Sequence, residues 1–156
     1  MSSGKAKINV RALSRELATK SKRTLLPLVA ARAKNAVERA KEQLIEEFVS
    51  HLITQEIEAG PKATNISGTL GGYGNLFSYI GLEEGSDPIS PIKSYLRKAL
   101  HLKKVKSSNF EFILLIELPS KEDIEALSPV PWAPGRSWVD AMERGLSGLG
   151  QYLTTI

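Results

Sequence analysis

The stretch GPKATNISGTLGGYGNLFSYIGLEEG, residues 60–85, decides the fold of this chain. It holds seven of the twelve glycines, and the apolar run LFSYI, residues 76–80, lies inside it. Glycine permits positive φ and close backbone approach, so a glycine cluster beside a β-prone run predicts a shaped loop that leads into a strand. Such a loop suits a hinge, a nucleotide cradle or a surface against which another chain packs.

Helical periodicity precedes the glycine stretch. Asn9 is the expected cap of a short helix with one apolar stripe, and the polar residues 19–23 are the expected turn after it. From Pro27 onward, apolar residues recur in steps of three and four, which predicts a second helix over residues 27–52. Gly60 and Pro61 mark its latest end.

Shorter elements follow the glycine stretch. The sequence predicts a strand over 75–82, a helix over 92–100 behind Ser90, an antiparallel hairpin of 102–106 with 110–118, a helical turn behind Ser120, a proline loop over 128–135 and a helix over 138–145 behind Ser137. The predicted class is α+β, a long N-terminal helix packed on a small antiparallel sheet, with short C-terminal helices and extended loops. We expect residues 1–8 to form a flexible basic arm and residues 9–156 to form a single domain.

Composition excludes several classes of protein. Without cysteine there is neither a disulfide framework nor a thiolate zinc site, and no apolar run is long enough for a membrane helix. The basic N-terminus lacks the apolar core of a secretory signal, so a cytoplasm-like setting is expected. Residues 1–43 carry eleven Lys or Arg against three Glu, a net of +8, whereas residues 44–156 carry ten against fourteen acids, a net of −4. The basic end suits nucleic acid, an acidic protein surface or simple solvation.

Catalytic and cofactor motifs are missing from the sequence. No glycine is followed by Lys at P-loop spacing, and the order helix, loop, strand does not fit a dinucleotide fingerprint. His51 and His101 stand in no zinc-binding pattern, and no serine lies in a nucleophile elbow. We therefore expect no enzyme activity, no cofactor and no metal. Trp132, Arg136 and Trp138 are of the types that gather at protein interfaces, although both tryptophans also suit the core of a single subunit.

Three segments resemble small virion proteins of tailed bacteriophages. They are TQEIEAGPKATNISGTLGGYGNLFSYIG (54–81), DPI (87–89) and WAPGRSWVDAMERGLSGLGQYL (132–153). The layout is similar to the head–tail joining or tail-completion family of long-tailed phages, in which a long helix precedes a Thr/Ser-Gly-x-Leu turn, here SGTL at 67–70, and a small sheet. The resemblance covers residues 27–153. This chain departs from the family in its longer glycine loop and in its tryptophan-bearing C-terminal segment.

The resemblance implies a structural ring protein, hexameric by family analogy, in the virion neck between the head connector and the tail, assembled in the host cytoplasm. Its implied partners are other copies of itself, neighbouring connector and tail proteins, and DNA passing through the lumen, with no membrane. The hypothesised subunit-interface residues are Thr69, Leu70, Tyr73, Leu76, Phe77, Trp132, Arg136 and Trp138. The residues hypothesised to meet DNA or an acidic partner are Lys5, Lys7, Arg11 and Arg15. The alternatives are a tail terminator or other connector ring, or a small basic nucleic-acid-binding protein.

Overall fold

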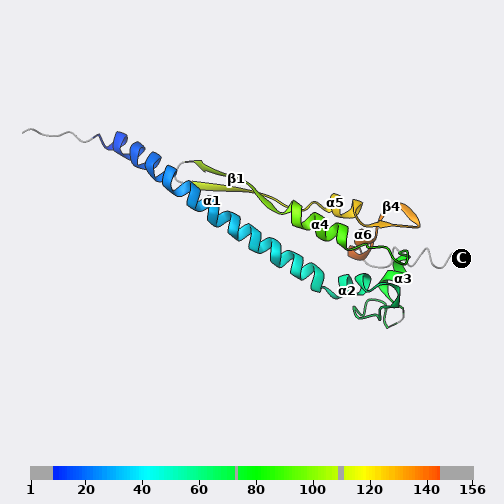
Figure 1. The fold of residues 1–156 in the computed structure, drawn as a ribbon. Helices are drawn as coiled ribbons and strands as arrows, with labels where there is room; N and C mark the ends of the chain where they lie inside the picture. Colours follow the sequence, from blue (N-terminus) through cyan, green and yellow to red (C-terminus); the bar gives the residue numbers. More distant parts are fainter. Residues whose placement is uncertain (1–8, 73, 109–110, 145–156) are drawn as a thin grey trace, which may run out of the picture. The chain divides into compact units, whose positions relative to one another are not determined.

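A computed structural model describes residues 9–72, 74–108 and 111–144 of the chain (Figure 1). The expected α+β class is confirmed, with a long N-terminal helix, a small antiparallel sheet and short C-terminal helices. In chain order the elements are α1 (Val10–Ser50), α2 (Leu52–Glu58), the 3₁₀ helix η1 (Gly60–Lys62), α3 (Leu76–Ile80), α4 (Ser90–Ala99), β1 (His101–Ser108), β2 (Glu111–Glu117), α5 (Lys121–Ala126), β3 (Pro129–Val130), β4 (Ala133–Ser137) and α6 (Trp138–Glu143).

The contacts of the chain gather in two compact units. Unit 1 consists of residues 1–38 and 101–117, and unit 2 consists of residues 39–100 and 118–156. The division falls within α1, and the single domain expected over residues 9–156 stays a prediction. The proposed basic arm, residues 1–8, lies outside the described residues.

In unit 1, α1 begins where the sequence predicts. The side chain of Asn9 accepts a hydrogen bond of 3.1 Å from the backbone N–H of Ala12, which is a helix N-cap. The expected turn over residues 19–23 is wrong, because α1 runs through it and contains Pro27. Residues 19–23 are Thr, Lys, Ser, Lys and Arg, which a helix tolerates, and Pro27 is exposed, so the carbonyl group it leaves without an N–H partner can turn to water.

The other part of unit 1 is the predicted hairpin. Strands β1 and β2 pair antiparallel, with His101 opposite Glu117 and Ser108 opposite Glu111, and the register shifts by a bulge between Leu102 and Lys104. Residues 109–110, which include part of the predicted turn, lie outside the described residues. Side chains of α1 between Ser14 and Leu25 line a hollow together with Ser107 and Phe112, so hairpin and helix are neighbours within this unit (Figure 1).

In unit 2, the predicted strand over 75–82 is wrong, because residues 76–80 form the short helix α3. Asn75 caps its start by accepting a hydrogen bond of 2.9 Å from Ser78 N–H, and Gly81 ends it in the left-handed conformation at φ 76°. His51 is exposed and caps α2, because its side chain accepts a hydrogen bond from Ile53 N–H. The two caps of α3 override the strand preference of its aromatic and β-branched residues.

The remaining elements of unit 2 surround one core. The expected caps Ser120 and Ser137 are confirmed, since their hydroxyls accept hydrogen bonds from Asp123 N–H and Asp140 N–H. Ser90 was expected to cap α4, but it belongs to the helix, and its N–H donates to the carboxylate of Asp87. The predicted proline loop contains the small β3–β4 pair. The buried core consists of Ile57, Leu76, Phe77, Ile80, Ile89, Ile92, Leu96, Val130 and Trp138.

Candidate assembly interface

A buried carboxylate organises the glycine-rich loop. Glu56 lies on α2 between the apolar residues Ile53 and Ile57, and its side chain is fully buried. One carboxylate oxygen accepts a hydrogen bond of 2.8 Å from Ser67 N–H, and the other accepts one of 2.7 Å from Leu76 N–H. The two ends of the loop are therefore tied to a single side chain, which fixes where the loop leaves α2 and where α3 begins.

The protonation of Glu56 follows from these contacts. Burial by itself raises the pKa of this carboxyl group, because it penalises the charged form. The hydrogen bonds that Ser67 and Leu76 donate outweigh burial, and the pKa lies below its ordinary value. Glu56 is therefore ionised at neutral pH, and the N–H groups that donate to it stabilise its charge.

Asn75 completes the frame of the loop from the other side. Its side-chain amide donates hydrogen bonds of 2.7 Å to the carbonyl oxygen of Pro61 and 3.1 Å to that of Ala63. Its side-chain oxygen caps α3, as described above. A single buried amide thus joins the chain before the glycines to the helix after them, so the loop is built on a fixed base.

Trp132 locks the end of α3 against the β3–β4 turn. Its indole N–H donates a hydrogen bond of 2.6 Å to the carbonyl oxygen of Ile80. At Gly81 a Cβ atom would lie 2.8 Å from Cδ1 of this indole, so the ring packs directly on the glycine backbone. Trp132 remains 41% exposed, which leaves one side of the indole open to solvent.

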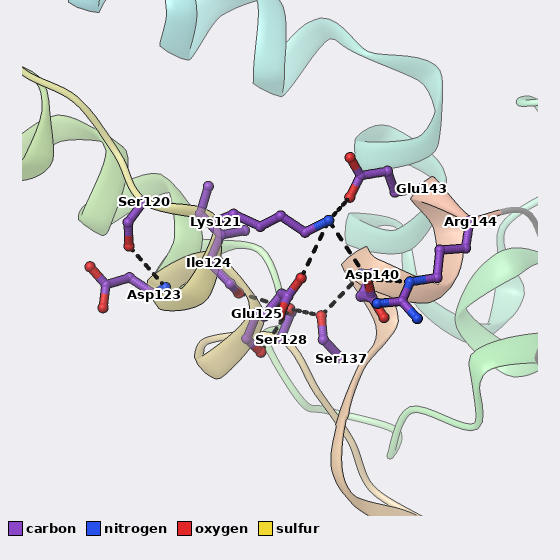
Figure 2. Close-up of polar contacts among 10 residues, drawn as sticks. All are labelled: Ser120, Lys121, Asp123, Ile124, Glu125, Ser128, Ser137, Asp140, Glu143 and Arg144. Atoms are coloured by element: carbon purple, nitrogen blue, oxygen red, sulfur yellow. Dashed lines mark hydrogen bonds and ion pairs between the residues drawn. The ribbon is translucent and has the colours of Figure 1, made fainter.

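Ion pairs join α5 to α6, and a hydrogen bond between the hydroxyl groups of Ser128 and Ser137 joins the residues after α5 to the end of β4 (Figure 2). Lys121 pairs with Glu143, Glu125 and Asp140, and Arg144 also pairs with Asp140 at 2.9 Å. The hydrogen bond to Glu143, together with the neighbouring carboxylates, raises the pKa of Lys121 above its ordinary value. Each of these three carboxylates faces a cation, so the arrangement fits a structural clasp rather than an acid–base pair.

The residues hypothesised from the sequence to form a subunit interface divide into two groups. Leu76, Phe77 and Trp138 are 0, 1 and 5% exposed and belong to the core, so these side chains have no surface to offer a second chain. This burial corrects their assignment from interface to core. Thr69, Leu70, Trp132 and Arg136 keep exposed or half-buried side chains, and Tyr73 lies outside the described residues.

The residues hypothesised to meet DNA or an acidic partner lie at the start of the chain. Arg11 and Arg15 are exposed on the first turns of α1. Lys5 and Lys7 lie outside the described residues. The exposed Lys103, Lys104 and Lys106 of β1 belong to the same unit as Arg11 and Arg15.

Strand β2 carries an exposed apolar surface that the sequence analysis did not assign. Ile113, Leu114, Leu115 and Ile116 are 38 to 45% exposed. Because side chains alternate along a strand, two of these residues lie on each face of the sheet. In the described residues β1 is the single strand that pairs with β2, so the second edge of β2 is also unpaired.

A second exposed apolar surface lies on α1 in the same unit. We name Val10, Leu13, Leu17 and Leu28 the helix stripe. They are 68, 47, 56 and 60% exposed. At 3.6 residues per turn these four positions lie within about 60° of one another around the helix.

Unit 2 contains an apolar groove of about 760 Å³. Ile92 and Leu96 of α4 and the indole of Trp138 form its most deeply buried wall. Glu47 and Glu143 contribute carboxylates to its lining. The remaining lining residues come from the end of α1, α2, α5 and α6 and from the segment before α5, and include Leu44, Phe48, His51, Ile53, Thr54, Pro119, Lys121, Ile124, Val139 and Met142.

The part of the chain that the structure describes offers no group of three or more His, Asp or Glu side chains suited to a metal ion. Within the same ranges, no helix has both the length and the apolarity to cross a bilayer. The described residues also present three apolar surfaces: β2, the helix stripe and the groove. The sequence carried two signals for them. Residues 113–116 form an uninterrupted aliphatic run, and Val10, Leu13 and Leu17 follow an i, i+3, i+7 pattern.

Glu56 was also missed by the sequence analysis. It stands at i+3 from Ile53 and immediately before Ile57, on the side of α2 that faces the core. A charged residue at an apolar position of a helix signals either exposure or a buried hydrogen-bonded role, and the second applies here.

Comparison with known proteins found no matching family model, no matching curated protein and no matching solved structure.

Proposed function

We propose that this chain is a structural assembly protein, a ring-forming component of the virion neck of a tailed phage that joins the head connector to the tail. Two kinds of support converge on this function. The segments 54–81, 87–89 and 132–153 resemble such neck proteins, for which the family implies a hexameric ring. The described residues also form a hydrogen-bonded glycine-rich loop, ion pairs between α5 and α6, and exposed apolar surfaces. These features suit a protein that assembles with other chains.

The observation that carries the assembly role is the exposed aliphatic run of β2. A two-stranded sheet exposes two faces, and Ile113 to Ile116 place aliphatic side chains on both of them. An exposed apolar strand with an unpaired edge pairs readily with other chains, and native proteins protect such an edge or use it for contact. Coverage by a neighbouring subunit or a neighbouring neck protein accounts for a surface that would otherwise be a liability.

The charge of unit 1 supports the position of this unit near DNA in the ring. Counted over the sequence, unit 1 carries twelve Lys or Arg against four Glu, a net of +8. A ring through which DNA passes tolerates such a surface, and contacts to the phosphate backbone need no base-reading motif. A tail terminator or another connector ring of the same neck remains the nearest alternative, and a free nucleic-acid-binding protein is the alternative outside this class.

The proposal is tested by the mass of the purified protein in solution. We expect light scattering over a concentration series, at two salt concentrations, to give a discrete multimer for the native chain. The double variant Leu114→Thr/Ile116→Thr, which places β-branched residues on one face of β2, should lower the mass toward that of a monomer. The matched control is Lys104→Thr/Lys106→Thr on the paired strand, which should keep the native mass.

Two results refute the proposal. One is a native chain that stays monomeric over the whole concentration range at both salts. The other is a native multimer whose mass is the same in the β2 variant, with both variants folded by circular dichroism. Steep loss of DNA binding with rising salt by a chain that remains monomeric would favour the nucleic-acid-binding alternative.

A further inference from the structure

The helix stripe has the geometry of a ligand for a groove. Val10, Leu13 and Leu17 stand at i, i+3 and i+7 on α1, each about half exposed or more. This is the spacing with which an amphipathic helix places its anchors in an apolar groove of another protein. Arg11 and Arg15 are also exposed on these turns of α1, but they lie about 100–160° around the helix from the stripe, so a partner surface for the stripe itself should be apolar.

The groove of unit 2 matches that description. Its wall is formed by apolar side chains of α1, α4 and α6, and Glu47 and Glu143 belong to its lining. Phe48, Val139 and Met142 are partly buried beside the core, so they retain apolar surface that a helix could cover. The groove is thus a concave apolar surface whose charged lining residues are Glu47 and the ion pair of Glu143 with Lys121.

Net charge selects a second copy of the chain as the source of the helix. Unit 1 carries a net of +8, whereas unit 2 carries nine Lys or Arg against thirteen acids, a net of −4. Contact of unit 1 with unit 1 would oppose like charges, whereas contact of unit 1 with unit 2 joins opposite charges. Each copy therefore contains both an apolar helix stripe on a basic unit and a groove on an acidic unit that can receive one.

We propose that the helix stripe of one chain docks in the unit 2 groove of a second chain. This inference rests on the proposed function, because it names one contact within the assembly. The two surfaces differ, so the contact is heterologous: every copy gives a stripe and receives one. Heterologous contacts close into rings when the rotation between copies permits, and otherwise they extend into filaments.

The absence of cysteine permits a direct test by cross-linking. One preparation carries Leu13→Cys and a second, distinguished by a mass tag, carries Met142→Cys. The two preparations are mixed under dilute conditions, and the mixture is then concentrated and oxidised. We expect a disulfide-linked dimer that contains one chain of each kind. The matched control pairs Leu13→Cys with Ser94→Cys, because Ser94 is exposed on α4 and lies about 160° or more around the helix from Ile92 and Leu96. Its yield should be at least about tenfold lower, since only the first pair is held together.

Paired substitutions on α1 give a second readout. Leu17→Glu places a charge in the stripe, and Ala12→Glu places the same charge about 140° around the helix. We expect Leu17→Glu to weaken self-association about tenfold or more, the loss typical of one buried leucine, and Ala12→Glu to change it less than about threefold.

The outcomes separate this inference from the proposed function. A multimer by light scattering in which the 13–142 pair cross-links no better than the 13–94 pair overturns the docking inference and leaves the ring proposal standing. If a chain that carries both Leu13→Cys and Met142→Cys forms a disulfide within itself, while the two single-cysteine chains form none between them, the docking inference is also overturned. If the β2 variant dissociates the multimer and Leu17→Glu does not, the docking inference is overturned and the ring proposal stands. A native chain that never multimerises overturns both the docking inference and the ring proposal.

Discussion

Replacing Glu56 by Gln should destabilise unit 2 strongly, although the two side chains are nearly equal in size. Glutamine keeps one acceptor oxygen and turns the other into a donor, so either Ser67 N–H or Leu76 N–H loses its partner. A hydrogen bond to a charged group contributes about 1.5–3 kcal/mol, and a buried donor without a partner costs about 1–3 kcal/mol. We expect the free energy of unfolding to fall by about 2–4 kcal/mol. For a domain of this size that lowers Tm by about 5–15 °C.

The pH dependence of this loss follows from the lowered pKa of Glu56 in the folded state. A carboxyl group of this kind contributes its full stabilisation above the pKa that it has when unfolded, ordinarily 4.5. That contribution disappears as pH falls through the lower folded-state pKa, because the protonated acid then binds the backbone no better than an amide does. The difference between the native chain and Glu56→Gln should therefore be widest near pH 7 and narrow below about pH 4.

Urea unfolding followed by tryptophan fluorescence measures this difference. Both tryptophans, Trp132 and Trp138, belong to unit 2, so the signal reports the unit that contains Glu56. The matched control is Glu58→Gln, which removes an exposed carboxylate of the same helix and should change stability by less than about 0.5 kcal/mol. Equal losses in the two variants, or a Glu56→Gln loss that is constant from pH 7 to about pH 3, would refute the assignment of Glu56 as the tie of the loop.

Two further substitutions test the same region by urea unfolding. Asn75→Ala removes the cap of α3 and both donations to the carbonyl groups of Pro61 and Ala63, so it should cost about 2–4 kcal/mol, and a loss below about 1 kcal/mol would contradict this frame. Gly81→Ala adds a Cβ atom 2.8 Å from Trp132 to the strain of φ 76°, whereas Gly85→Ala meets open space at φ 85°. The first should cost about 2–3 kcal/mol and the second about 1 kcal/mol, and equal losses would show that Trp132 does not press on Gly81.

The elements predicted correctly from the sequence are those specified by neighbouring residues. Ser120 and Ser137 each stand three residues before an aspartate, and the structure confirms both as helix caps. The hairpin of residues 101–117 was predictable because the aliphatic run of β2 has strong strand preference and the partner strand lies close to it in sequence. In each case the deciding contacts join residues near in sequence, and a local pattern is sufficient to reveal them.

Where distant contacts decide, the local pattern misled. Residues 76–80 have the composition of a strand, yet they form a helix that Asn75 and Gly81 cap. The first N–H of this helix, that of Leu76, donates a hydrogen bond to Glu56, twenty residues earlier in the chain. The secondary-structure propensity of residues 76–80 contains no information about a hydrogen bond to a side chain of α2. Pro27 led to a second wrong prediction. A proline often stands at the start of a helix, so the sequence predicted a helix beginning at Pro27, whereas α1 extends on both sides of it.

The most informative error concerns burial. Phe77 and Trp138, expected at a subunit interface, are enclosed by the core of their own chain, whereas the aliphatic residues 113–116 are exposed on both faces of a two-stranded sheet. A sequence records how apolar a segment is, but it does not record which chain covers it. A core needs a second layer on each apolar face, and a hairpin of two strands exposes both of its faces. In the described part of unit 1 the helix α1 is the other element, and its stripe is exposed as well. The proposed assembly supplies these missing layers from neighbouring molecules, and so accounts for the exposed strand.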